Sequence, residues 1–232
     1  MAKALLRFTP RSFLSIFAFL LVLNFCTVSY AQRFTGKLIL GINGAQLDGD
    51  GFGGFYRGGL LAGFGADFPI NDRLSIGPEF LYSGKGSQVT LDQMEQMGLP
   101  RVIYKLNYID IPIILTYKVR PSFRVLAGFS INYLLQAEID NGSNLGFIDQ
   151  RKLFNDFDYQ VLAGMEYEVF DNIWLQGRWS YSALSINKVG PTSPGFPSIT
   201  GQRGGYFNNL LQFSLRFNFG TGSKKESSDV KP

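Results

Sequence analysis

Several features on which catalytic and disulfide-bonded proteins depend are missing from this chain of 232 residues. It contains no histidine, so it cannot use an imidazole as general base beside a serine or a water-positioning aspartate. Metal sites built on histidine are excluded for the same reason. Its single cysteine, Cys26, lies in a segment expected to be removed, which leaves the mature protein no disulfide and no thiolate.

An excess of charge of one sign is also missing. The chain has 22 basic and 18 acidic residues. The first 31 residues hold three of the basic residues and no acidic one, so their removal leaves a net charge of 19 − 18 = +1. Such a balance gives no electrostatic support to a nucleic-acid partner.

The N-terminal segment has the three parts of a secretory signal. Lys3, Arg7 and Arg11 form a basic region, the apolar stretch 13–23 follows, and Ser29-Tyr30-Ala31 places small residues at the cleavage position. This pattern predicts a cleaved signal peptide over residues 1–31. The alternative is a retained transmembrane helix of about 20 apolar residues. The small residues at the cleavage position argue against it.

Beyond that segment no long hydrophobic run occurs, and apolar residues instead alternate with smaller or more polar ones. The clearest example is 123–136, where every odd-numbered residue is apolar and most even-numbered ones are glycine or polar. Alternation with period two indicates a β-strand with two different faces. Eight such runs are present, at 38–42, 60–68, 74–83, 109–117, 123–136, 157–169, 173–183 and 209–219.

The composition of the two faces indicates a membrane barrel. One face carries large aromatic and aliphatic side chains, which suit lipid, whereas the other carries glycine, small polar residues and isolated charges, which suit the narrow interior of an eight-stranded barrel. Aromatic residues near the ends of the runs are expected to form girdles at the membrane surfaces. These residues are Tyr82, Tyr104, Tyr117, Tyr133, Trp179 and Tyr181.

The lengths of the connections support the same architecture. Long connections at 47–55, 84–103, 137–155 and 187–204 alternate with short ones at 69–73, 118–122 and 170–172, as in outer-membrane barrels, whose long loops lie outside and whose short turns are periplasmic. We therefore predict an all-β, eight-stranded antiparallel up-and-down transmembrane β-barrel over residues 32–219. Its expected location is the cell outer membrane, with both termini periplasmic and a flexible polar tail over 220–232. A soluble lipocalin-like barrel is the main structural alternative.

Charged residues on the inward faces are expected to pair with one another, because buried charges are tolerated when they are paired. We interpret them as a structural network that fills the barrel interior, with a narrow ion path or an active site as the alternatives. The predicted members are Glu79, Asp110, Arg124, Asp158, Glu166, Glu168, Arg178 and Arg216.

Two short motifs are similar to ligand-binding patterns, but neither fits its pattern fully. Asp48-Gly49-Asp50-Gly51 is similar to the start of a calcium loop, but Phe52 stands where a further oxygen ligand is needed. Gly84-Lys85-Gly86 lacks both the upstream glycine of a phosphate-binding loop and a serine or threonine directly after the lysine. We expect no catalytic residue, no metal site and no cofactor.

The order and spacing of several loose motifs resemble the PorT-like outer-membrane β-barrel family of Bacteroidota over essentially the whole mature chain. The motifs are Tyr82-Ser83-Gly84-Lys85-Gly86, Tyr108-Ile109-Asp110-Ile111-Pro112 followed by Tyr117, Ala127-Gly128, Ala163-Gly164-Met165-Glu166-Tyr167 and Arg178-Trp179-Ser180-Tyr181. The resemblance implies an outer-membrane barrel, and the namesake of the family is associated with the type IX protein secretion system. One departure is that Phe219 is followed by a polar tail rather than ending the chain.

The expected function is a non-enzymatic, integral outer-membrane component with a structural or assembly role. Its expected partners are outer-membrane lipid and a protein of the secretion apparatus or the envelope, with no nucleic acid. Two alternatives stay open: a small pore or solute-binding barrel, and a soluble periplasmic carrier of the lipocalin kind.

Overall fold

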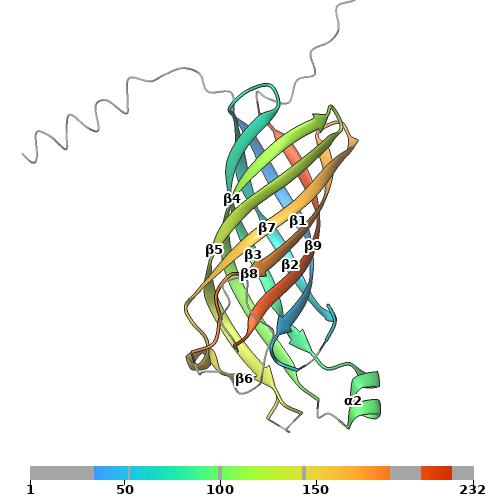
Figure 1. The fold of residues 1–232 in the computed structure, drawn as a ribbon, viewed down its shortest axis with the longest axis vertical. Helices are drawn as coiled ribbons and strands as arrows, with labels where there is room; N and C mark the ends of the chain where they lie inside the picture. Colours follow the sequence, from blue (N-terminus) through green and yellow to red (C-terminus); the bar gives the residue numbers. More distant parts are fainter. Residues whose placement is uncertain (1–33, 52, 99–100, 143–144, 189–204, 221–232) are drawn as a thin grey trace, which may run out of the picture. The chain divides into compact units, whose positions relative to one another are not determined.

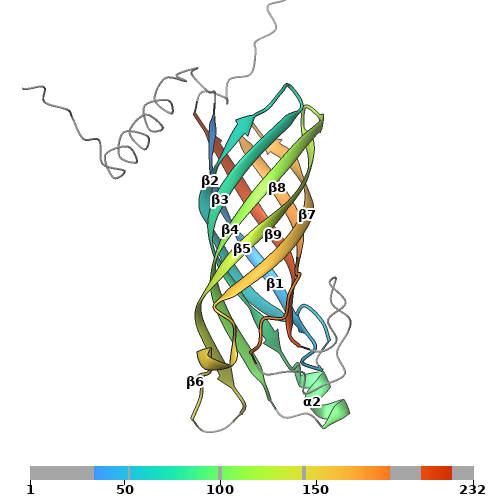
Figure 2. The ribbon, with the colours of Figure 1, turned by 60° about the vertical axis from the view of Figure 1, so that its left-hand side comes forward.

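The computed structural model describes residues 34–51, 53–98, 101–142, 145–188 and 205–220. The predicted signal peptide with Cys26, most of the expected long connection 187–204 and the predicted tail beyond Gly220 lie outside the described residues. The described part of the chain forms one compact unit, shown in Figures 1 and 2.

Eight long strands follow one another around a closed barrel. They are β1 (Thr35–Asp48), β2 (Arg57–Pro69), β3 (Leu74–Gln88), β4 (Ile103–Arg120), β5 (Phe123–Asp140), β7 (Phe157–Phe170), β8 (Ile173–Ser182) and β9 (Phe207–Phe219). Neighbours pair antiparallel, and β1 pairs with both β2 and β9, which closes the sheet. The fold class expected from the sequence, an eight-stranded antiparallel up-and-down barrel, is confirmed.

The barrel has two unlike ends. Turns 70–73, 121–122 and 171–172 form the short-turn end, and the loops after β1, β3, β5 and β8 form the long-loop end. At the long-loop end lie the helix α2 (Leu91–Met97), the short strand β6 (Ile148–Asp149), which pairs with β5, and the 3₁₀ turn η1 (Arg151–Leu153). Figures 1 and 2 show β6 and α2 together at this end, opposite the short turns.

Several strands are longer than the sequence predicts, and most of the excess lies at the long-loop end. The expected loop 84–103 instead continues β3 to Gln88, and β4 begins at Ile103. Both β4 and β5 have 18 residues, whereas about 9–11 residues of tilted strand cross a bilayer. Between β3 and β4, α2 begins at a capping box in which Thr90 and Gln93 bond each other's backbone, and it ends at Gly98 in the left-handed conformation.

A β-bulge corrects one face assignment. Asn107 pairs with Gln136 and Tyr108 with Leu134, so β5 carries one residue more than β4 at this point. As a result Gln136, which simple alternation places inward, is exposed, and Ala137 is buried instead. Tyr104 also departs from its expected place in a girdle, because it packs inward against the apolar cluster at the long-loop end.

The outer wall is apolar and the interior is polar, the reverse of a soluble barrel. Ile42, Phe64, Phe129, Met165 and Phe213 point outward with 55–63% of their surfaces exposed. Inside, charged side chains such as Lys37, Glu79 and Arg216 are at most 2% exposed. No helix among the described residues is long and apolar enough to cross a membrane.

Apolar residues inside the barrel form three separate clusters. Two are small, Ile39 with Leu61 and Leu81, and Ile114 with Leu126 and Leu162. The third, which we call the apolar plug, lies beneath the long loops and brings together barrel and loop side chains. Its buried members are Leu47, Leu106, Tyr108, Leu134, Ala137, Phe154 and Ile186.

Candidate functional site

The barrel interior is the candidate site, because it gathers most of the buried charge of the molecule. Near the short-turn end seven side chains form what we call the lower charge cluster. Its members are Lys37, Asp67, Glu79, Arg124, Glu166, Arg178 and Arg216. Strand alternation turns each of them inward, and the two glycine-rich strands β2 and β3 leave space for the longer chains.

One ion pair of this cluster crosses the full width of the lumen. Arg178 on β8 donates from Nη1 and Nη2 to the two carboxylate oxygens of Glu79 on β3, each at 2.6 Å. In the closed strand order β3 and β8 are four strands apart in either direction. They therefore lie opposite each other, and this bidentate pair, with side chains at most 2% exposed, spans the lumen.

A second cation, Lys37, pairs with Glu79 across a glycine of the intervening strand. Lys37 Nζ on β1 lies 2.7 Å from Glu79 on β3 and 2.7 Å from Asp67 on the intervening strand β2. The residue of β2 that separates Lys37 from Glu79 in register is Gly65. A Cβ atom at Gly65 would lie 2.8 Å from Lys37 Cε and 2.9 Å from Glu79 Cγ, so glycine leaves the room in which the pair meets.

Arg216 joins the two halves of the lower charge cluster. Its Nη1 donates to both oxygens of Glu166 at 3.1 and 3.0 Å, and its Nη2 donates to Asp67. Glu166 also accepts from Arg124 at 3.3 Å and from Gln176 at 3.0 Å. The Arg124 guanidinium stacks on the ring of Trp174 at 3.8 Å, a cation–π contact that adds to its pairing.

Farther toward the long loops a smaller charged group surrounds Lys85. Lys85 Nζ lies 2.9 Å from Asp110 and 3.8 Å from Asp158, and 4.5 Å from the centre of the Tyr108 ring. Asp158 accepts from Asn208 at 2.9 Å and from Gln160 at 2.7 Å. Lys85 thus lies inside β3 rather than in the loop to which the sequence assigned Gly84-Lys85-Gly86.

The side-chain amide of Asn132 joins Asp110 and Lys85 in the charged group around Lys85. In the orientation that satisfies both its donor and its acceptor, Asn132 donates to Asp110 at 3.1 Å and accepts from Lys85 at 3.3 Å. Between the two charged groups, Asn43 donates to Ser83 at 2.9 Å and accepts from Gln212 at 3.1 Å. Hydrogen bonds therefore cross between strands in both charged groups and at Asn43.

The structure brings seven of the eight residues proposed from the sequence into ion pairs. The eighth, Glu168, is half-buried at the end of β7, and no ion pair between described residues includes it. Arg124 is the most open of the seven, with 23% of its side chain exposed. The remaining six are buried.

Sequence reasoning missed Lys37, Asp67 and Lys85. A charge imbalance was the available signal, since the eight proposed residues include three cations and five anions. The ion pairs of the two charged groups involve five cations (Lys37, Lys85, Arg124, Arg178, Arg216) and five anions (Asp67, Glu79, Asp110, Asp158, Glu166). The interior is therefore electrically balanced.

The carboxylates of the two charged groups are all paired with cations. Each of them faces a lysine or arginine within 4 Å. Within the described ranges no group of three or more His, Cys, Asp or Glu residues is placed to hold a metal ion.

An apolar outer wall around a charged, side-chain-filled lumen defines an integral membrane β-barrel. The family described as an outer membrane protein beta-barrel domain matches residues 31–187, which is more than half of the chain. The chain therefore belongs to this family, and the expected location in the cell outer membrane is confirmed. A soluble lipocalin-like carrier is not favoured, because its outer face would have to be polar.

The chain is similar to several solved structures of bacterial outer-membrane proteins. Ail, the attachment invasion locus protein of Yersinia pestis, is 10% identical with a TM-score of 0.48, over 81% of this chain and 99% of that one. Neisserial surface protein A is 16% identical with a TM-score of 0.45, over 80% and 97%. OprG from Pseudomonas aeruginosa is 9% identical with a TM-score of 0.40, over 82% and 97%. The comparison with curated proteins gives no match.

Proposed function

We propose that this chain is a closed, non-enzymatic barrel that acts as a structural or assembly component of the outer membrane. The observation that carries the proposal is the bidentate Arg178–Glu79 pair across the lumen. Lys37 holds the same carboxylate, so Glu79 is fixed from two sides. A lumen crossed by buried, multiply bonded charges favours a solid barrel over a conduit for solutes.

The chemistry of the interior supports a non-enzymatic role. The chain has no histidine, and the interior carboxylates are held by cations rather than by a nucleophile or a water-activating group. Active sites need groups whose protonation is matched to their task, whereas paired charges in a packed lumen serve to fill space and fix the register of the strands.

A PorT-like role in protein secretion is the assembly process we propose. The motif Tyr108-Ile109-Asp110-Ile111-Pro112 supplies two interior residues, Tyr108 of the apolar plug and Asp110 beside Lys85. This placement supports a likeness to the PorT-like family in how the lumen is filled, rather than in which partner is bound. Partner contacts would then come from outside the lumen, and the long-loop end offers exposed apolar side chains such as Leu91 and Leu145, 73% and 78% exposed.

The test is purification of a tagged copy from native membranes in mild detergent, with identification of the proteins that co-purify. An envelope or secretion protein in stoichiometric amount is the expected result. Recovery of the barrel alone from the outer-membrane fraction would contradict an assembly role and favour an autonomous barrel.

Two sets of variants locate the contact. Leu91→Glu and Leu145→Glu alter the long-loop end, whereas Arg120→Glu alters the short-turn end, where Arg120 is exposed. Loss of the partner from the first set but not from the second is expected. The opposite pattern would assign the contact to the periplasmic turns.

A further inference from the structure

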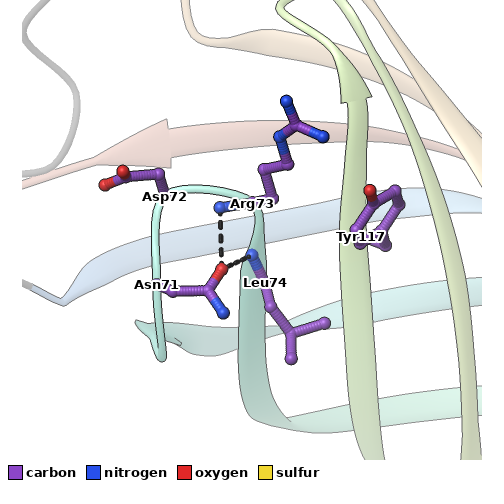
Figure 3. A pocket seen from close by; sticks show the side chains of 5 residues that line it. All are labelled: Asn71, Asp72, Arg73, Leu74 and Tyr117. Atoms are coloured by element: carbon purple, nitrogen blue, oxygen red, sulfur yellow. Dashed lines mark hydrogen bonds between the residues drawn. The ribbon is translucent and has the colours of Figure 1, made fainter.

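A shallow pocket opens on the outer wall at the short-turn end, apart from the charged lumen. Its volume is about 360 Å³, and it is lined by Asn71, Asp72, Arg73, Leu74 and Tyr117 (Figure 3). Leu74 on β3 and Tyr117 on β4 are direct cross-strand partners. The two side chains give the pocket an apolar floor next to a charged turn.

The turn that forms the rim is held firmly by its own hydrogen bonds. The Asn71 side-chain oxygen accepts from the backbone N–H groups of Arg73 at 2.9 Å and Leu74 at 2.8 Å, as Figure 3 shows. The carbonyl of Arg73 accepts from the N–H of Lys118 at 2.7 Å, and the N–H of Ile70 bonds Leu74 at 2.8 Å. Arg73 is therefore fixed at its backbone before any ligand arrives, which lowers the entropy lost on binding.

The guanidinium of Arg73 is available to a ligand. Arg73 is exposed, and none of the ion pairs between described residues includes it. Asp72 is its nearest acidic neighbour in the chain, but Figure 3 shows the Asp72 carboxylate on the side of the turn away from Tyr117. Lys118 and Arg120 are also exposed at the end of β4, but neither lines the pocket.

The position of the pocket in the wall indicates what kind of ligand it meets. Ile111, Leu115, Tyr117 and Val119 form one outward row on β4, each 41–49% exposed, and Tyr117 lies near the short-turn end of that row. Short turns of outer-membrane barrels are periplasmic, and aromatic residues mark the level of the headgroups. The pocket is thus continuous with the lipid-facing wall at the periplasmic leaflet.

We propose that this pocket binds a phospholipid of the periplasmic leaflet. The Arg73 guanidinium holds the phosphate through charge-assisted hydrogen bonds, and the first part of an acyl chain lies on Leu74 and Tyr117. Both parts of the ligand are needed, because the pocket places the Arg73 guanidinium beside an apolar floor, while the Asp72 carboxylate points away from Tyr117.

The test uses the barrel purified from membranes, delipidated in detergent and examined by native mass spectrometry with three probes. The probes are a phosphatidylglycerol, the diacylglycerol with the same chains, and glycerol 3-phosphate. Retention of the phosphatidylglycerol above both others is expected. Arg73→Gln should lower that retention about tenfold, the loss expected for one charge-assisted bond, and Arg73→Lys should lower it less.

Arg120→Gln is the matched control, since it removes the same charge at the same end of the barrel but outside the pocket. It should leave retention unchanged, and a gel shift on heating verifies that each variant is folded. Equal retention by Arg73→Gln and Arg120→Gln would overturn the proposal, as would equal binding of the diacylglycerol. Retention of glycerol 3-phosphate alone would also overturn it and indicate a site for free phosphate esters.

Discussion

The lumen is filled by charge near the short turns and by apolar side chains beneath the long loops. In the lower charge cluster, the Arg178–Glu79 pair connects opposite strands directly. In the apolar plug, Phe154 and Ile186 from the loops pack against Leu106 and Leu134 of the wall. Ion pairs depend on the position of each atom, whereas apolar contacts depend on volume and tolerate repacking.

This difference follows from where each region lies in the membrane. The lower charge cluster lies inside a wall of eight strands, whose number fixes the width of the lumen, and long charged side chains fill that space. The apolar plug lies where β4 and β5 extend beyond the other strands, and there the loops supply the missing volume. Each end therefore responds to substitution in its own way.

Glu79→Ala is expected to have the largest effect on stability, because it leaves Lys37 and Arg178 buried without their shared partner. Removal of one member of a buried pair costs about 3–5 kcal/mol. Urea unfolding of the refolded barrel in detergent, followed by the fluorescence of Trp174 and Trp179, measures the free energy of unfolding. A loss below about 1 kcal/mol, the level of an exposed pair, would contradict a tightly coupled cluster.

Phe154→Ala tests the apolar plug. Phe154 is 1% exposed, and truncation of a buried phenylalanine costs about 3–5 kcal/mol. We expect the lower part of that range, because loop neighbours can relax toward the cavity. Hydrogen exchange should rise at the amides of Asn155 and Ile186, which bond Ile186 and Tyr206 respectively. Unchanged exchange at both amides would show that the plug does not hold the loops.

Gly65→Ala tests the claim that Lys37 and Glu79 meet in the space left by a glycine. The added Cβ would meet the Pro78 carbonyl oxygen at 2.7 Å as well as Lys37 and Glu79, and overpacking of this kind costs about 1–3 kcal/mol. Gly58→Ala in the same strand is the control, since a Cβ at Gly58 has nothing within 4 Å. Equal unfolding midpoints for the two variants would refute the role given to Gly65.

The smallest effect is expected at the pair of Lys105 and Glu138, which lies outside the lumen at 3.0 Å with side chains 35% and 22% exposed. Glu138→Ala should lower the free energy of unfolding by no more than about 1 kcal/mol. The urea experiment applied to Glu79→Ala measures it. A loss as large as that for Glu79→Ala would remove the contrast between buried and exposed pairs.

Much of this fold was predictable because alternation with period two reports the two faces of a strand directly. The runs from Phe157 and Phe123 were placed correctly at their starts. The extensions of β3 and β4 were not, because Gly84 and Gly86 are typical of loops in a sequence and become strand residues only through pairing with β4. The exposure of Gln136 likewise depends on a bulge that alternation cannot express.

The sequence predicts which charged residues face the interior, but not which of them pair with each other. Parity places Glu79 and Arg178 inward, but only the closed strand order puts residues 99 positions apart against each other. Lys37 and Lys85 were overlooked because each lies where the pattern is weakest, one at the start of the first strand and one between glycines. The surface pocket at Arg73 needed the packing of a turn against the neighbouring strand, which sequence does not report.

Conductance in a planar bilayer tests most directly whether the lumen is closed. The purified barrel should give no stable single-channel steps, because the Arg178–Glu79 pair and the apolar plug both obstruct the path. Stable steps in the unaltered protein, with a size that changes in Arg178→Ala, would contradict a closed lumen and identify the barrel as a small pore.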